Sequence, residues 1–143
     1  MHGLKVSRGE VDDPGYHPWH DANKAAGHMA EEVGYYPRPP RVSSRRMVGC
    51  YQGRLRDRAV GTYLLDVPDH DDVVAIIVTP DHPKRFSLSR SFLREDVLFY
   101  ACGYEQCRIV AIRVGDLTYC AVGHAGHDRL ARVLLNVVPF EGR

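Results

Sequence analysis

Residues 107–123 decide the fold of this chain, and they read Cys107-Arg-Ile-Val-Ala-Ile-Arg-Val, Gly115-Asp, Leu117-Thr-Tyr-Cys-Ala-Val-Gly. Two apolar runs flank a Gly-X pair, a pattern that predicts a β-hairpin closed by a two-residue type II′ turn. A two-residue loop also fixes the register of the two strands. We therefore predict that Ala111 pairs with Cys120, and Cys107 with His124.

This register predicts a candidate metal site at the open end of the hairpin. Cys107 and His124 should share a face of the sheet, with their Cβ atoms about 5 Å apart. A thiolate and an imidazole so placed suit zinc, copper or cobalt, and His127 is a candidate third ligand. Cys120 lies about 13 Å along the strand from His124, too far to share the ion. The alternative is that a Cys and a His merely face each other there.

Two further histidines, His17 and His20, repeat the His-x2-His spacing of His124 and His127. On a helix, imidazoles three residues apart can reach one metal ion. We therefore include His17 and His20 as candidate ligands. They could supply the fourth ligand of the first site, for which Cys102 is the alternative, or bind a metal by themselves. The chain has eight histidines, so both pairs can also arise from composition alone.

Downstream of the hairpin, Asp128–Val138 predicts a helix. Leu130, Val133, Leu134 and Val137 recur at helical spacing on one face. Asp128 is the expected N-cap, and the following proline ends the helix.

Upstream of the hairpin, the pattern is that of strands. Asp72–Thr79 is a continuous, largely β-branched run, typical of a strand buried on both faces. Met47–Tyr51 and Ala59–Asp66 predict two more strands, joined by the polar turn Gly53–Arg58. For Arg85–Leu93 and Val97–Ala101 the pattern does not decide between strand and irregular structure.

Apolar residues from Trp19 to Tyr36 recur every three or four positions and predict an amphipathic N-terminal helix. Pro37-Arg-Pro-Pro-Arg-Val should follow as an extended, semi-rigid linker. The expected fold is α+β: an antiparallel sheet of four to six strands with an N-terminal and a C-terminal helix packed on it. We predict one domain over residues 1–143, with the helix and linker in 1–40 and the sheet and closing helix in 41–143.

Charge, hydropathy and the absence of known motifs narrow the range of functions that the sequence supports. Nineteen Lys and Arg against 18 Asp and Glu give a net charge of +1, which does not indicate a nucleic-acid partner. No apolar run is long enough to predict a membrane segment, and no secretory signal is evident at the N-terminus. We therefore expect reduced cysteines and a cytoplasmic location, or a periplasmic one if the chain is part of a membrane-anchored protein. Motifs for phosphate binding, metalloproteases and serine hydrolases are not found.

Four segments carry a further pattern. They are Met47-Val-Gly-Cys-Tyr-Gln-Gly-Arg-Leu leading into Arg58-Ala-Val-Gly-Thr-Tyr-Leu-Leu, then Val73-Val-Ala-Ile-Ile-Val-Thr-Pro, then the region from Cys102 through Gly123, and finally His127-Asp-Arg-Leu-Ala-Arg-Val-Leu. Over about residues 47–138 this pattern resembles the extracytoplasmic sensor region of membrane-anchored bacterial anti-sigma factors. The family's zinc-binding anti-sigma domain and membrane helix are not found in the chain. We therefore expect either a soluble relative that keeps the sensor fold or a portion of a longer protein.

The resemblance implies sensing and binding without turnover, with a sigma factor or another regulatory component as the protein partner. The first hypothesis is thus a non-enzymatic regulatory or sensor domain, with a metal-responsive version in which zinc or copper binds at the Cys/His site. One alternative is a small metal-binding or redox enzyme that uses Cys107, His124 and His127. Another is a structural module that binds a partner and no small ligand. A homodimer is also compatible with the sequence.

Overall fold

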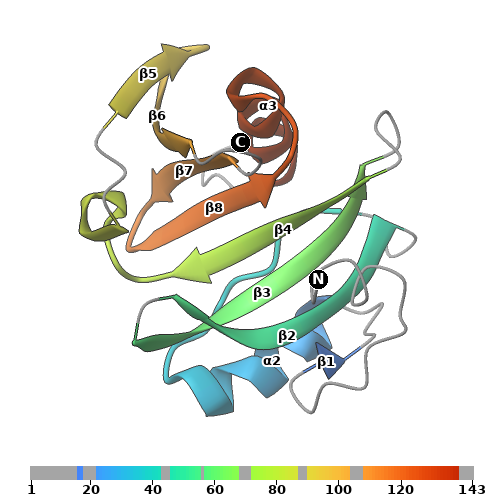
Figure 1. Ribbon diagram of the computed structural model, residues 1–143. Helices are drawn as coiled ribbons and strands as arrows, with labels where there is room; N and C mark the ends of the chain where they lie inside the picture. The colour runs from blue at the N-terminus through green and yellow to red at the C-terminus, as the bar shows by residue number, and fades with distance from the viewer. Residues whose placement is uncertain are drawn as a thin grey trace.

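Eight strands form one antiparallel sheet in the part of the chain that the computed structural model describes, namely residues 16–17, 22–42, 46–55, 57–67, 72–86, 90–103 and 108–138. The strand order is β1-β2-β3-β4-β8-β7-β6-β5 (Figure 1). The strands are β1 (Tyr16–His17), β2 (Met47–Leu55), β3 (Arg58–Val67), β4 (Asp72–Thr79), β5 (Arg90–Arg94), β6 (Val97–Gly103), β7 (Arg108–Val114) and β8 (Leu117–Gly123). The helices are α2 (Ala22–Val33), α3 (His127–Val137) and a short 3-10 helix, η2 (Pro83–Phe86). The α+β class is confirmed, and the expected number of strands was too low.

The hairpin of β7 and β8 is as the sequence predicts. Ala111 pairs with Cys120, and Val114 pairs with Leu117 across the Gly115-Asp116 turn. Gly115 has a φ of 62°, in the left-handed region that glycine adopts without a Cβ penalty.

A second two-residue hairpin joins β5 and β6, which accounts for two of the additional strands. Arg94 pairs with Val97, and Glu95 and Asp96 between them have φ of 51° and 62°. Positive φ at both central residues is the mark of a type I′ turn, which usually contains Asn or Gly. Glu-Asp gives no such signal, so the sequence pattern left this region undecided.

The first hairpin is longer than expected. β2 extends to Leu55 and β3 starts at Arg58, so the polar stretch 53–58 expected as a turn is mostly strand. Gly53 lies within β2, where a Cβ would be only 3.1 Å from the Thr62 hydroxyl and 3.2 Å from the Tyr51 ring. The glycine at position 53 therefore allows close packing within the strand and does not mark a turn.

Both helices pack on the same face of the sheet. Gly61 of β3 and Gly123 of β8 lie on this face. Buried Tyr63 and Ala121 stand two residues away from them in the same strands, and positions two residues apart in a strand point to the same face. A Cβ at Gly61 would be 3.5 Å from the Met29 sulfur of α2, and one at Gly123 would be 3.5 Å from Leu130 of α3. The core therefore lies between this face and the helices, and Figure 1 shows α2 against β2 and β3, and α3 at the β7–β8 end.

The helix bounds differ by a few residues from the prediction. α2 ends at Val33, and Gly34 follows with a φ of 87°, as a helix C-terminus favours. α3 begins at His127 with Gly126 as N-cap, so the expected N-cap, Asp128, lies inside the first turn. There its negative charge suits the positive end of the helix dipole. No helix among the described residues is long and apolar enough to cross a membrane.

The segment 34–42, of which residues 37–42 were expected to be a linker, packs against the core through its prolines. We call it the strap, because it runs extended across the helix-covered face. Pro37 and Pro40 are buried, and a Cβ at Gly61 would be 2.8 Å from Pro37. The Arg41 amide donates to the Val137 carbonyl at 2.6 Å, which attaches the strap to the end of α3.

Candidate functional site

The predicted metal site is described only in part. The last pair of the β7–β8 ladder is Arg108 with Gly123, as the predicted register requires. Cys107 and His20 themselves lie outside the described residues. His17 is placed by its backbone in β1, opposite Cys50. The structure therefore leaves the complete ligand set untested.

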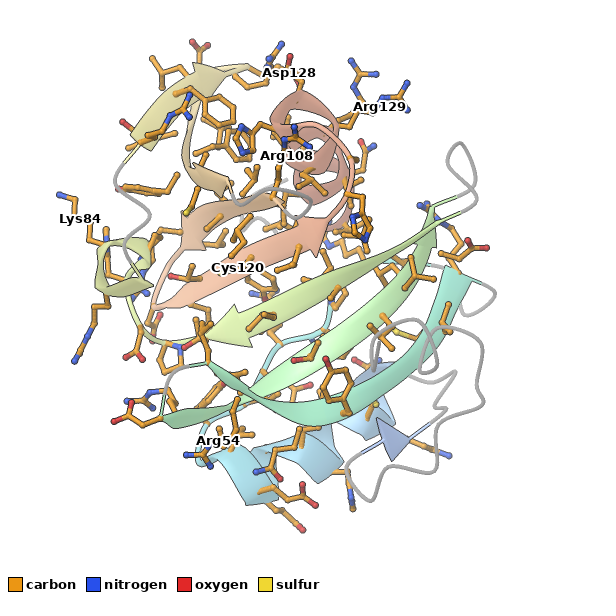
Figure 2. The ribbon with its side chains drawn as sticks, viewed as in Figure 1. Arg54, Lys84, Arg108, Cys120, Asp128 and Arg129 are labelled. Carbon is orange, nitrogen blue, oxygen red and sulfur yellow. The ribbon has the colours of Figure 1, made fainter. Side chains whose placement is uncertain are left out.

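The two described histidines of this site flank the start of α3. His124 is exposed just after β8, while His127 is half-buried, with its Nε2 3.3 Å from the Cys102 carbonyl oxygen. The Arg108 guanidinium donates to the His124 carbonyl at 3.4 Å, and Figure 2 shows Arg108 and Asp128 at the same end of the molecule. Among the described residues, no group of three His, Cys, Asp or Glu could hold a metal ion. A cation here would also be repelled by Arg108.

Cys120 is placed in the middle of the sheet on β8 (Figure 2), with its side chain buried against Ala111. Burial raises the pKa of its thiol to about 12. A thiol of this kind stays protonated near neutral pH, and the thiolate is the form that attacks or ligates. Cys120 is therefore a packing residue. Cys50 and Cys102 are likewise not joined in a disulfide.

A cavity of about 320 Å³ lies between the strap and the tip of the β7–β8 hairpin. The strap contributes Tyr35, Tyr36 and Arg38, and the loop after β4 contributes Pro80. The hairpin contributes Val114, Gly115, Asp116, Leu117 and Tyr119. This volume lies at the lower end of the range in which proteins bind small molecules.

Tyr35 is one of the residues that line this cavity, and two hydrogen bonds fix its hydroxyl. Its hydroxyl donates to the Val78 carbonyl and accepts from the Gly61 amide at 3.1 Å. Gly61 and Val78 face each other in the β3–β4 ladder, so the hydroxyl bridges the two strands at that pair. Burial raises the pKa of Tyr35 to about 12. The ring is thus held rigidly.

Two more tyrosines hold the strap by its carbonyl groups. The Tyr63 hydroxyl donates to the Pro37 carbonyl, and the Tyr119 hydroxyl donates to the Arg38 carbonyl at 2.9 Å. Burial raises the pKa of both phenols, and the charge of Arg38 partly offsets this effect at Tyr119. Because Tyr35, Tyr63 and Tyr119 all donate to backbone carbonyls, they remain protonated and act as anchors. They are poorly suited to exchange protons with a substrate.

Little in the sequence predicts this cavity. The apolar stripe predicts Tyr36 inside the N-terminal helix, whereas Tyr36 follows the end of the helix and is 51% exposed. The cavity walls come from residues separated by up to about 80 positions, so no local motif describes them. A Tyr-Tyr-Pro run after a helix-ending glycine is the one local signal, and its meaning depends on the sheet that it crosses.

Comparison with known proteins supplies no further assignment. No family model, no curated protein sequence and no solved structure matches this chain.

Proposed function

We propose that this chain is a non-enzymatic sensor or regulatory domain that binds a small ligand in the cavity beneath the strap. The observation that carries the proposal is the hydrogen bonding of the cavity tyrosines. The hydroxyls of Tyr35 and Tyr119 donate to backbone carbonyls, so the aromatic walls are preorganised for binding. A mostly apolar wall, with Arg38 and Asp116 as its charged residues, suits recognition better than proton transfer.

The position of the cavity suits signalling to a protein partner. The strap leads out of α2 through Gly34, and its far end is bonded to the C-terminus of α3 through Arg41 and Val137. A ligand in the cavity would contact the strap and the β7–β8 hairpin together, and so would favour one arrangement of these elements. In line with the resemblance to anti-sigma sensor regions, we propose that a sigma factor or another regulatory component reads this change.

The test is equilibrium dialysis of the purified protein against a metabolite extract, followed by mass spectrometry of what the protein retains. We expect a retained compound at a ratio near one per chain, recovered chemically unchanged after prolonged incubation. Leu117→Trp, which fills the cavity, should abolish retention, whereas Leu98→Trp on the exposed face of β6 should not. Conversion of the compound to a product would contradict the proposal and favour an enzyme.

A metal-responsive sensor is a second candidate, favoured by the confirmed hairpin register. Arg108 pairs with Gly123, and one further step along the ladder would bring Cys107 opposite His124. Zinc or copper held there would lie next to His127 at the start of α3. Elemental analysis of the purified protein, with a count of free thiols in native and denatured protein, tests this candidate. Stoichiometric metal supports it, and four free thiols without metal contradict it.

A further inference from the structure

We infer that the cavity selects a small aromatic carboxylate, with the flat ring between the tyrosines and the carboxylate on Arg38. This inference rests on the proposed function, because it names the ligand class of the same site.

The shape and chemistry of the walls favour a flat apolar body. Tyr35, Tyr36 and Tyr119 line the cavity, together with Pro80 and the apolar residues of the hairpin, and its lining is mostly apolar. Aromatic rings pack on one another with a gain beyond that of buried area alone. Tyr35 and Tyr119 are fixed by their hydrogen bonds, so little side-chain entropy is lost when a ring enters. A one-ring or two-ring compound would fit a cavity of about 320 Å³.

The charge of the cavity favours an anion. Arg38 is only partly exposed, and its charge is close enough to the Tyr119 hydroxyl to affect the pKa of that phenol, though less than burial does. A guanidinium offers a planar fork of donors that matches a carboxylate. Asp116, the other charged residue of the lining, lies exposed at the hairpin turn. Solvent screens Asp116 more strongly, so Arg38 should dominate the choice of ligand charge.

The test uses three probes with one ring system: 2-naphthoate, neutral 2-naphthalenemethanol and cationic 2-naphthylmethylammonium. Isothermal titration calorimetry of the full chain should show 2-naphthoate binding at least tenfold more tightly than either of the others. Arg38→Gln keeps the backbone carbonyl that Tyr119 bonds, and it should weaken 2-naphthoate binding about tenfold. Binding of the neutral probe should change little in that variant.

Arg41→Gln is the matched control, because Arg41 lies on the same strap but is exposed and outside the cavity. It should leave 2-naphthoate binding within twofold of the unaltered protein. Arg38→Lys is a second variant that keeps the charge without the planar fork, and it should bind with intermediate strength. Far-ultraviolet circular dichroism of each variant confirms that it is folded.

Three results would overturn the inference. They are binding of the cationic probe as tightly as 2-naphthoate, undiminished 2-naphthoate binding in Arg38→Gln, and no binding of 2-naphthoate at millimolar concentration. If dialysis nevertheless captures an unchanged compound of another class that Leu117→Trp excludes, the proposed sensor function stands and only the ligand class is wrong. If neither experiment detects a ligand, both proposals fail.

Discussion

The Tyr35 hydroxyl lies where β3 and β4 would otherwise form a backbone hydrogen bond with each other. It bridges the Gly61 amide and the Val78 carbonyl, so Tyr35→Phe would leave both groups without this partner. We expect a loss of about 1–3 kcal/mol in the free energy of unfolding, because unsatisfied buried polar groups are costly. Urea denaturation measures this loss.

Tyr36→Phe is the control for that substitution, since Tyr36 is 51% exposed. Its free energy of unfolding should change by no more than about 0.5 kcal/mol. Equal effects of the two substitutions would show that the Tyr35 bridge contributes nothing to stability.

The raised pKa values predict the direction of alkaline destabilisation. Burial raises the pKa of Cys120 from 9.0 to about 12, so above pH 9 the unfolded chain releases a proton that the folded protein retains. Stability present below pH 9 is therefore lost as the pH rises toward 12, at up to about 1.4 kcal/mol per pH unit from this thiol. In Cys120→Ala, stability measured by urea denaturation at pH 9 to 10 should fall less steeply by this amount. The pKa of Tyr35 is also raised, from 10.0 to about 12, so its ionisation in the unfolded chain lowers stability further above pH 10, in both proteins alike. An unchanged slope would contradict a raised thiol pKa.

At the scale of the elements, the β5–β6 turn is the clearest place at which a substitution should increase stability. Glu95 and Asp96 both have positive φ, which residues with a Cβ adopt at a cost. Replacing the pair by Asn-Gly, the preferred type I′ sequence, should raise the free energy of unfolding by about 0.5–1 kcal/mol. Gly115→Ala, at a φ of 62°, should lower it by a similar amount. Thermal denaturation followed by circular dichroism measures both, and a destabilised Asn-Gly variant would contradict the turn assignment.

The two hairpins show how far local sequence could predict this fold. Gly115-Asp116 was predictable because glycine marks a turn that needs positive φ, and the register followed from the loop length. Glu95-Asp96 makes the same kind of connection with residues that carry no turn signal. The strap was not predictable, because its partners Tyr63 and Tyr119 lie 26 and 81 residues away in sequence. The prolines of this run predicted only a stiff, extended segment. Their burial depends on the sheet that the segment crosses.

The candidate metal site makes a prediction about the β7–β8 hairpin. If the chain binds a transition metal, Cys107 and His124 should be ligands and Cys120 should not, because Cys120 is buried and protonated. Metal titration near neutral pH should then show loss of binding in Cys107→Ser and unchanged binding in Cys120→Ser. Binding should weaken as the pH falls, because both ligands must be deprotonated. Loss of binding in the Cys120 variant alone would contradict the hairpin geometry. Unchanged binding in both variants would place the metal elsewhere, most simply at His17 and His20.

At the scale of the whole molecule, the strap connects the part of the sheet beneath α2 with the part beneath α3. Tyr35 bonds it to β3 and β4, Tyr119 bonds it to β8, and Arg41 bonds it to the end of α3. The strap thus crosses the junction where β4 meets β8, between the strands beneath α2 and those beneath α3. A ligand held against it stabilises the folded chain, by about 2.7 kcal/mol at a concentration 100 times its Kd.

Hydrogen exchange can show whether this stabilisation spreads along the whole strap. The amides of Gly61 and Arg41 donate at opposite ends of the strap, to Tyr35 and to Val137. If the strap responds as one unit, saturating 2-naphthoate should slow the exchange of both amides by similar factors. The amide of Asp96, in the distant β5–β6 turn, serves as the reference and should change little. Slowing confined to the hairpin amides at 115–117 would mean that the ligand touches the hairpin without fixing the strap. The cavity would then lack the link to α2 and α3 that a sensor needs, whatever the affinity of its ligand.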